Sequence, residues 1–198
     1  MWSLLDADQD IPWPDQPITY QLKFRFWVQE YDPAYHTNVQ RTTWGIGSPV
    51  EYDVPKCEEG IPGCSQEVNP ATGELRWIHT IRGTFSSGKG GKLVSAHFHC
   101  HAPTCLKTAL YRCPEDNPVC DETTATLLCE ETAVWKDGSG ERFNEPGFIY
   151  QPPCLWGSEE VGLEAPVDVH DYTLFAIKTA DATYGHHGEM AWLQMYYV

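Results

Sequence analysis

Residues 92–101 read KLVSAHFHCH, and this stretch decides the fold class of the chain. Successive side chains of a β-strand point to opposite faces, so His97, His99 and His101 would share one face. The opposite face would be apolar and would carry Val94, Ala96, Phe98 and Cys100. The pattern therefore predicts a strand with one face on a hydrophobic core and three imidazoles on the other.

Similar runs occur on both sides of this strand. The clearest alternation of apolar and polar residues is at 18–30 (ITYQLKFRFWVQE). Further strands are predicted at 42–46, 75–85, 106–113, 126–129, 148–151, 172–178 and 191–198. Between them, the sequence predicts a hairpin connection at 86–91, a long loop at 53–73 and a turn at 135–140. Since amphipathic helical patterns are absent, we expect an all-β, antiparallel, jelly-roll-like β-sandwich, a single domain over 1–198 with an extended arm at 1–16.

The cysteine count indicates a disulfide-bonded domain. There are eight cysteines, at positions 57, 64, 100, 105, 113, 120, 129 and 154. None of the spacings is the Cys-x-x-Cys knuckle of zinc ribbons, so disulfides are favoured over a thiolate zinc site. Disulfides form in oxidising compartments, so we expect a secreted protein. The pairing stays open at this stage, although Cys57 and Cys64 could close the loop at 53–73.

Charge and hydropathy exclude two classes of partner. The formal net charge is −15 at pH 7, which disfavours nucleic acid and anionic membrane surfaces. No apolar run approaches the roughly 20 residues that a membrane-spanning helix needs. We therefore expect neither nucleic acid nor a membrane span among its associations.

The three histidines form a candidate metal site. Neighbouring side chains on one strand face are roughly 6.5–7 Å apart, so two imidazoles can reach one ion. The alternative is an ordinary polar strand face. Near the C-terminus, Met190 would lie on the outer face of a strand whose core face carries Leu193 and Met195. A thioether is a ligand that Cu(I) favours and that zinc accepts poorly, so the combination predicts copper.

The same residues resemble a known family. The copper type II, ascorbate-dependent monooxygenases, which include peptidylglycine and dopamine β-monooxygenases, have a second domain with a methionine-bound copper. The resemblance covers roughly 92–198 and rests on four motifs in the family's order: His99-Cys100-His101, Pro166-Val167-Asp168-Val169, Glu189-Met190 and Tyr196-Tyr197. It implies that His99, His101 and Met190 bind the oxygen-activating copper, with His97 and His99 as the competing imidazole pair. His186 and His187 are further candidate ligands, and Glu189 could orient a ligand imidazole, although a surface carboxylate is the commoner outcome.

The chain also departs from the family. The family's separate domain with a three-histidine copper has no counterpart here. The substrate clamp of the peptide-amidating members is absent, because the matching positions hold His97 or Phe98, Trp192 and Gln194. The cysteine pair near the methionine strand is replaced by Thr179 and Ala191.

Two functions from different classes follow. The first is a copper-dependent monooxygenase that hydroxylates an unknown small-molecule or peptide substrate with a separate electron donor. The second is a non-catalytic secreted or cell-surface module that binds metal structurally or keeps a relic site. A zinc hydrolase is a distant third, because methionine is a poor zinc ligand.

Overall fold

The computed structural model describes residues 24, 26–87, 91–101, 104–135 and 149–198. The chain divides into two compact units, 1–38 and 39–198, each taken here by itself. The described residues of the first unit form no strand, and Phe26 and Val28 are 83% and 92% exposed. The strand predicted at 18–30 is therefore wrong for residues 24 and 26–30; its remainder and the arm at 1–16 lie outside the described residues. An alternating sequence forms a strand only where it can pair with another strand and pack one face against a core.

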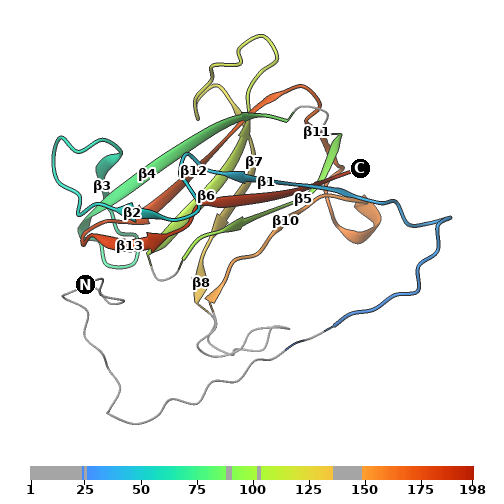
Figure 1. The fold of residues 1–198 in the computed structure, drawn as a ribbon, viewed down its shortest axis with the longest axis horizontal. Coiled ribbons are helices and arrows are strands. Elements are labelled where there is room, and N and C mark those ends of the chain that lie inside the picture. Colours follow the sequence, from blue (N-terminus) through green and yellow to red (C-terminus); the bar gives the residue numbers. More distant parts are fainter. Residues whose placement is uncertain (1–23, 25, 88–90, 102–103, 136–148) are drawn as a thin grey trace. The chain divides into compact units, whose positions relative to one another are not determined.

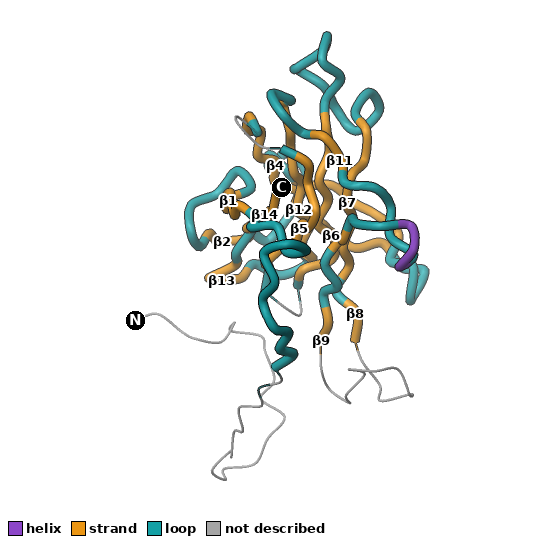
Figure 2. Tube along the Cα trace, turned by 90° about the vertical axis from the view of Figure 1, so that its right-hand side faces the viewer, coloured by secondary structure: helices purple, strands orange, loops and turns teal. Residues whose placement is uncertain are grey.

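The second unit is built on two five-stranded sheets. The first sheet has the order β1 (Gln40–Gly45), β14 (Trp192–Tyr197), β5 (Lys92–His99) and β10 (Cys154–Leu155), and β11 (Val167–Asp168) also pairs with β5. The second has the order β3 (Cys64–Val68), β4 (Leu75–Ser86), β12 (Thr173–Asp181), β6 (Cys105–Arg112) and β7 (Thr126–Thr132). Two smaller pairs join β13 (His186–Glu189) to β2 (Tyr52–Val54) and β8 (Val134–Trp135) to β9 (Ile149–Tyr150). Figures 1 and 2 show these strands.

Every pairing between these strands is antiparallel. In the described part of the chain, the one helical segment is a short 3-10 turn, Glu159–Val161, and no helix is long and apolar enough to cross a membrane. The all-β, antiparallel class predicted from the alternating runs is thus confirmed.

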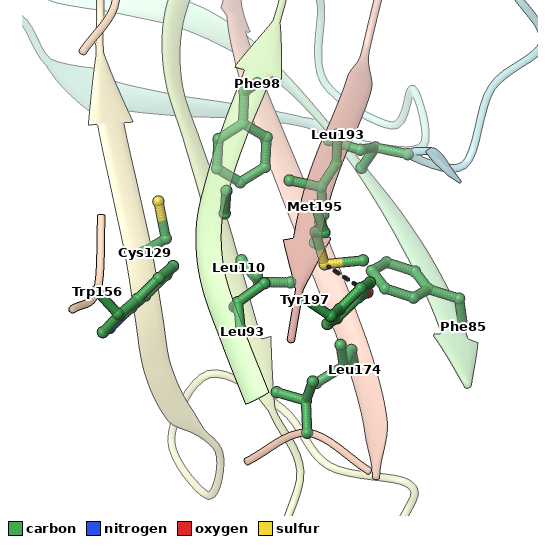
Figure 3. Packing of buried hydrophobic residues seen from close by; sticks show 14 of the residues in the cluster. Phe85, Leu93, Phe98, Leu110, Cys129, Trp156, Leu174, Leu193, Met195 and Tyr197 are labelled. Carbon is green, nitrogen blue, oxygen red and sulfur yellow. Dashed lines mark hydrogen bonds between the residues drawn. The ribbon is translucent and has the colours of Figure 1, made fainter. Parts of the chain in front are cut away.

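The core lies between the two large sheets. Phe98, Leu193 and Met195 of the first sheet are completely buried and belong to one cluster with Leu110 and Leu174 of the second. Figure 3 shows these side chains converging, with the Tyr197 hydroxyl donating to the Met195 sulfur at 3.4 Å. Alternate residues of β14 therefore face inward, as its sequence predicts.

A register shift changes the inner face of β5. Tyr196 pairs with Ser95, but Tyr197 pairs with Leu93, so Val94 is skipped in the ladder. Leu93 is fully buried and Val94 only half-buried, although simple alternation puts Val94 on the core face. An irregularity of this kind turns the strand locally, and sequence alternation cannot reveal it.

Two predicted connections differ in the structure. The segment at 86–91 does not close a hairpin, because β4 and β5 belong to different sheets; its residues 88–90 lie outside the described part. The loop predicted at 53–73 contains β3 and the end of β2. Almost all of the turn predicted at 135–140 is outside the described residues.

All eight cysteines form disulfides, which confirms the predicted framework. Three bonds close short segments: Cys57–Cys64, Cys100–Cys105 and Cys113–Cys120. The fourth, Cys129–Cys154, joins β7 of one sheet to β10 of the other. With no free cysteine left, a thiolate zinc site is excluded.

Candidate metal centre

The histidine stretch lies at one end of the first sheet. His97 and His99 are on β5, and His101 lies two residues beyond the end of that strand. The predicted alternation is confirmed at Ala96 and Phe98, which are fully buried, while His99 is exposed and the other two imidazoles are half-buried; Cys100, predicted on the core face, is also only half-buried. All three histidines are thus available at the surface of the sandwich.

His99 and His101 lie close to one another. Their ring centroids are 5.3 Å apart and the ring planes are nearly perpendicular. Metal–nitrogen bonds of about 2 Å at tetrahedral angles would put two imidazole centroids on the order of 5 Å apart. The spacing of this pair therefore fits two ligands of one ion.

The imidazole of His101 is held by the methionine segment. Its Nδ1 atom is 2.6 Å from the Gly188 carbonyl oxygen. A carbonyl oxygen only accepts hydrogen bonds, so Nδ1 carries the proton and Nε2 keeps a free lone pair. A metal-binding histidine usually has this arrangement, with one ring nitrogen donating to a backbone carbonyl and the other free to bind. Gly188 has φ of +74°, a conformation that other residues adopt only with strain.

Met190 lies next to His101 through a shared acceptor. One oxygen of Glu189 accepts hydrogen bonds from the backbone N–H of His101 at 2.6 Å and of Met190 at 3.0 Å. The β5–β14 ladder ends at the pair Trp192–His99, and Met190 lies two residues before Trp192, in the short segment between β13 and β14. Met190 is half-buried, whereas Met195 is completely buried in the core.

A buried ion pair between Lys178 and Glu189 connects this arrangement to the second sheet. Lys178 on β12 and Glu189 are 0% and 1% exposed, and their charged atoms are 2.7 Å apart. Lys178 also donates to the Met190 carbonyl oxygen at 2.7 Å, and its ammonium lies 5.0 Å from the centre of the Tyr52 ring. The other oxygen of Glu189 accepts from the Thr104 hydroxyl at 2.7 Å. The network therefore ties the histidine segment, the methionine segment and the second sheet together.

The ionisation of this pair follows from its partners. Burial acts to raise the pKa of Glu189, but the hydrogen bonds from Lys178 and Thr104 outweigh it and hold that pKa below its usual value. Burial lowers the pKa of Lys178 to about 8, against the opposing effect of Glu189. Both groups are therefore charged at neutral pH.

One expectation about this region was wrong, and one residue of the network was not predicted. Glu189 is not a surface carboxylate, and it binds the backbone of His101 while Gly188 holds the ring. Lys178 was missed by the sequence reasoning. The signal was its place inside the run LFAIKTA, which is buried throughout, because a lysine in such a run needs a buried partner.

The remaining histidine candidates have other partners. His97 Nδ1 is buried and lies 3.7 Å from Glu131, a fully buried carboxylate that also accepts from the backbone N–H of Phe98. Burial raises the pKa of Glu131, and His97 opposes that rise. His187 pairs with Asp53 at 3.0 Å, and His186 Nε2 lies 3.4 Å from the Asp181 carbonyl oxygen.

The described residues contain one cluster of three His, Cys, Asp or Glu donor atoms within 4.8 Å of one another: Cys129, Glu131 and Cys154. Two of its members form a disulfide and cannot bind a metal as thiolates. The three imidazoles do not form such a cluster together, so His99 and His101 are candidates as a pair. Burial lowers the pKa of His99, with His101 and His97 adding to the effect, which favours the neutral, metal-binding imidazole.

A surface hollow of about 540 Å³ lies beside this pair. It is lined by three segments: Ser95, His97, Phe98 and His99 of β5, Gln194 and Tyr196 of β14, and Tyr150, Gln151 and Pro153. His99 thus belongs both to the close imidazole pair and to the wall of the hollow. We refer to this feature below as the hollow.

Comparison with known proteins names no family. No family model and no curated protein matches the chain. Among solved structures, the K1 cleaved adhesin domain of Lys-gingipain from Porphyromonas gingivalis W83 matches over 80% of this chain and 98% of its own, with 14% identity and a TM-score of 0.30. A similarity this low carries no information about the function.

Proposed function

We propose that this chain is a secreted, copper-binding β-sandwich in which His99, His101 and Met190 are the metal ligands. The four disulfides support a location in an oxidising compartment. The residues at the site fit a copper ion because they offer two imidazoles and a thioether at one end of one sheet.

The contact network of Glu189 is the observation that carries the proposal. One carboxylate oxygen binds the backbone of both His101 and Met190, and the Gly188 carbonyl fixes the His101 ring. Because the carboxylate is buried and ion-paired, the two segments are held together without a metal. Such preorganisation favours binding, since the backbone of both segments and the His101 ring are already held in place.

The choice of copper rests on the thioether. Imidazole serves zinc, copper and iron alike, whereas a methionine sulfur favours Cu(I). If Met190 is a ligand, its removal should weaken Cu(I) much more than Zn(II). That difference separates a copper site from a general histidine site.

Metal analysis of the purified protein tests the proposal. The wild-type chain, loaded with Cu(I) under reducing conditions that leave the disulfides intact and then desalted, should retain one copper per chain. His99→Ala and Met190→Ala should each lower Cu(I) affinity at least tenfold. His170→Ala is the matched control, because its imidazole pairs with Asp171 in a separate loop.

Equal copper retention by the wild type, His99→Ala and Met190→Ala would contradict the proposed ligands. A further comparison of His97→Ala with His101→Ala decides between the two imidazole pairs. We expect the larger loss for His101→Ala.

A second candidate function is hydroxylation of a bound substrate, and the hollow beside His99 favours it. A substrate there would lie next to the metal ligands. Bound copper would supply one-electron redox chemistry and oxygen activation. The overall reaction takes a C–H bond, O₂, two electrons and two protons to an alcohol and water, with the electrons from a small reductant of the ascorbate type.

Oxygen uptake coupled to product formation tests this activity. Ascorbate and copper-loaded protein should consume O₂ in proportion to the hydroxylated product formed from a substrate of the hollow. Copper binding with no product from any ligand shown to bind the hollow would favour the non-catalytic module instead.

A further inference from the structure

The outer face of β5 and β14 makes an ordered floor for the hollow. Ser95 lies opposite Tyr196, and His97 lies opposite Gln194. Residues opposite each other in neighbouring strands point to the same face, so hydroxyl, imidazole, amide and phenol groups stand side by side. The floor therefore alternates hydrogen-bonding groups with an aromatic ring.

The wall of the hollow is fixed to this floor. It is formed by Tyr150, Gln151 and Pro153, directly before Cys154. Cys154 is bonded to Cys129 and pairs with Ala96 of β5. The side-chain amide of Gln151 lies 3.1 Å from the Cys100 sulfur. These contacts hold the wall in place, and a preformed site costs little ordering when a ligand binds.

His97 lies between the hollow and the buried Glu131 carboxylate. Its Nδ1 atom is buried 3.7 Å from that carboxylate and makes no hydrogen bond within the described part of the chain, while the side chain as a whole is 42% exposed. The exposed part of the ring therefore faces the hollow. Glu131 is itself held by the Phe98 backbone. His97 thus has the place of a ligand-contacting residue of the hollow rather than that of a third metal ligand.

The charge around the hollow argues against anionic ligands. Its described lining residues include no lysine or arginine, and a buried carboxylate lies behind His97. Arg41 of β1 lies opposite Tyr196 but is not among the described lining residues. The net charge of −15 on the whole chain also disfavours the approach of a carboxylate or phosphate ligand. The lining suits a neutral ligand with many hydrogen-bonding groups.

We propose that the hollow binds a neutral saccharide. A pyranose ring has flat C–H faces that can lie on Tyr150 and Tyr196, and hydroxyls at its edge that can pair with Gln151 and Gln194. Polar groups that fix orientation within an apolar, aromatic lining are the usual composition of a ligand site, and 540 Å³ is within the usual size range. The position of the saccharide next to a metal rests on the proposed function, but its binding does not.

Calorimetric titration of the metal-free protein tests the saccharide site. The probes are cellohexaose, xylohexaose, laminarihexaose and chitohexaose, with hexagalacturonate as the anionic counterpart. At least one neutral hexasaccharide should bind with a Kd of about 1 mM or tighter, and hexagalacturonate should bind at least tenfold more weakly. Tyr196→Ala and Gln194→Ala should each weaken binding at least tenfold.

Tyr184→Ala is the matched control, because this tyrosine is 59% exposed and does not line the hollow. It should leave the affinity unchanged. The saccharide site is refuted if none of the four neutral probes binds below about 10 mM, if the anionic probe binds as tightly, or if Tyr196→Ala has no effect.

The two proposals can fail separately. Met190→Ala should abolish tight Cu(I) binding and leave saccharide affinity in the metal-free protein unchanged. Copper without saccharide would overturn only the inference about the hollow, and saccharide without copper would overturn only the metal proposal.

Discussion

The inner and outer faces of the β5–β14 pair differ in burial, although residues of the two faces alternate along the same two strands. On the inner face, Met195 and Phe98 are completely buried against the second sheet. Outside the core, His99 at the end of β5 is exposed, and His101 after β5 and Met190 before β14 are half-buried. Two methionines five positions apart in the chain thus have different surroundings: Met195 packs in the core, and Met190 is half-buried beside His101, where we propose that it binds copper. The difference lies in position and partners, because the side chains are identical.

The link between the two faces is the Lys178–Glu189 pair. Lys178 belongs to the second sheet, yet it donates to the Met190 carbonyl and to the carboxylate that binds His101. A buried ion pair often contributes less stability than apolar residues of similar volume, but it fixes groups in defined positions. We infer that it holds the outer site in place from within the core.

The largest expected loss of stability comes from disrupting the buried Lys178–Glu189 pair. Lys178→Met leaves the Glu189 carboxylate buried without its cation, which should cost about 3–5 kcal/mol of unfolding free energy. Chemical denaturation followed by circular dichroism measures it. Lys107→Met is the matched control, because the Lys107–Glu130 pair is exposed at both ends and should contribute at most about 1 kcal/mol. Similar losses for the two variants would mean that the buried pair has no special role.

The next effect separates the two methionines. Met195→Ala removes a fully buried side chain from the core and should cost about 2–5 kcal/mol of unfolding free energy. Met190→Ala should cost less than about 1 kcal/mol, because this side chain is only half-buried. Thermal and urea unfolding of the metal-free variants gives both values. If Met190→Ala lowers the unfolding free energy more than Met195→Ala does, the proposed difference between the two methionines is contradicted.

The strand that carries Met195 also shows how much of the fold could be predicted from the sequence. Alternation in 191–198 correctly put Leu193 and Met195 inward, and the runs at 42–46, 75–85 and 106–113 correctly became strands. Alternation reports which face a residue takes, so it works for strands inside a sheet. It failed at 18–30, where the described residues have no partner strand.

Long-range contacts explain what could not be predicted. The segment at 86–91 crosses between sheets, and no local pattern distinguishes a crossing from a hairpin. For the site, the accessible histidines between buried Ala96 and Phe98 followed from periodicity, whereas the direction of the Met190 side chain stays a prediction. The role of Lys178 did not, because it depends on a contact between β12 and the segment before β14.

The disulfide between the sheets gives the third effect. Changing both Cys129 and Cys154 to Ala releases β10 from β7 and should cost about 2–4 kcal/mol of unfolding free energy. Saccharide affinity should fall as well, since Cys154 anchors the wall of the hollow. Removing Cys113–Cys120 in the same way is the control, because that bond closes a loop away from β5 and should leave the affinity unchanged.

The smallest effect on stability concerns the segment before Met190. Gly188→Ala forces a left-handed backbone on a residue with a side chain and should cost roughly 1 kcal/mol. Space is not the cause, because a Cβ at this position would meet nothing within 4 Å. A shifted carbonyl would loosen the His101 ring, so Cu(I) affinity should fall further than stability. An unchanged affinity would show that the ring is held by other contacts.

X-ray absorption at the copper edge tests the central claim most directly, because it detects the thioether sulfur at the metal. Copper(I)-loaded wild-type protein should show nitrogen and one sulfur scatterer, and Met195→Leu, a swap of similar volume, should show the same spectrum. Met190→Leu should lose the sulfur and keep the nitrogen. A sulfur signal that survives in Met190→Leu, or that is absent from the wild type, would contradict the account.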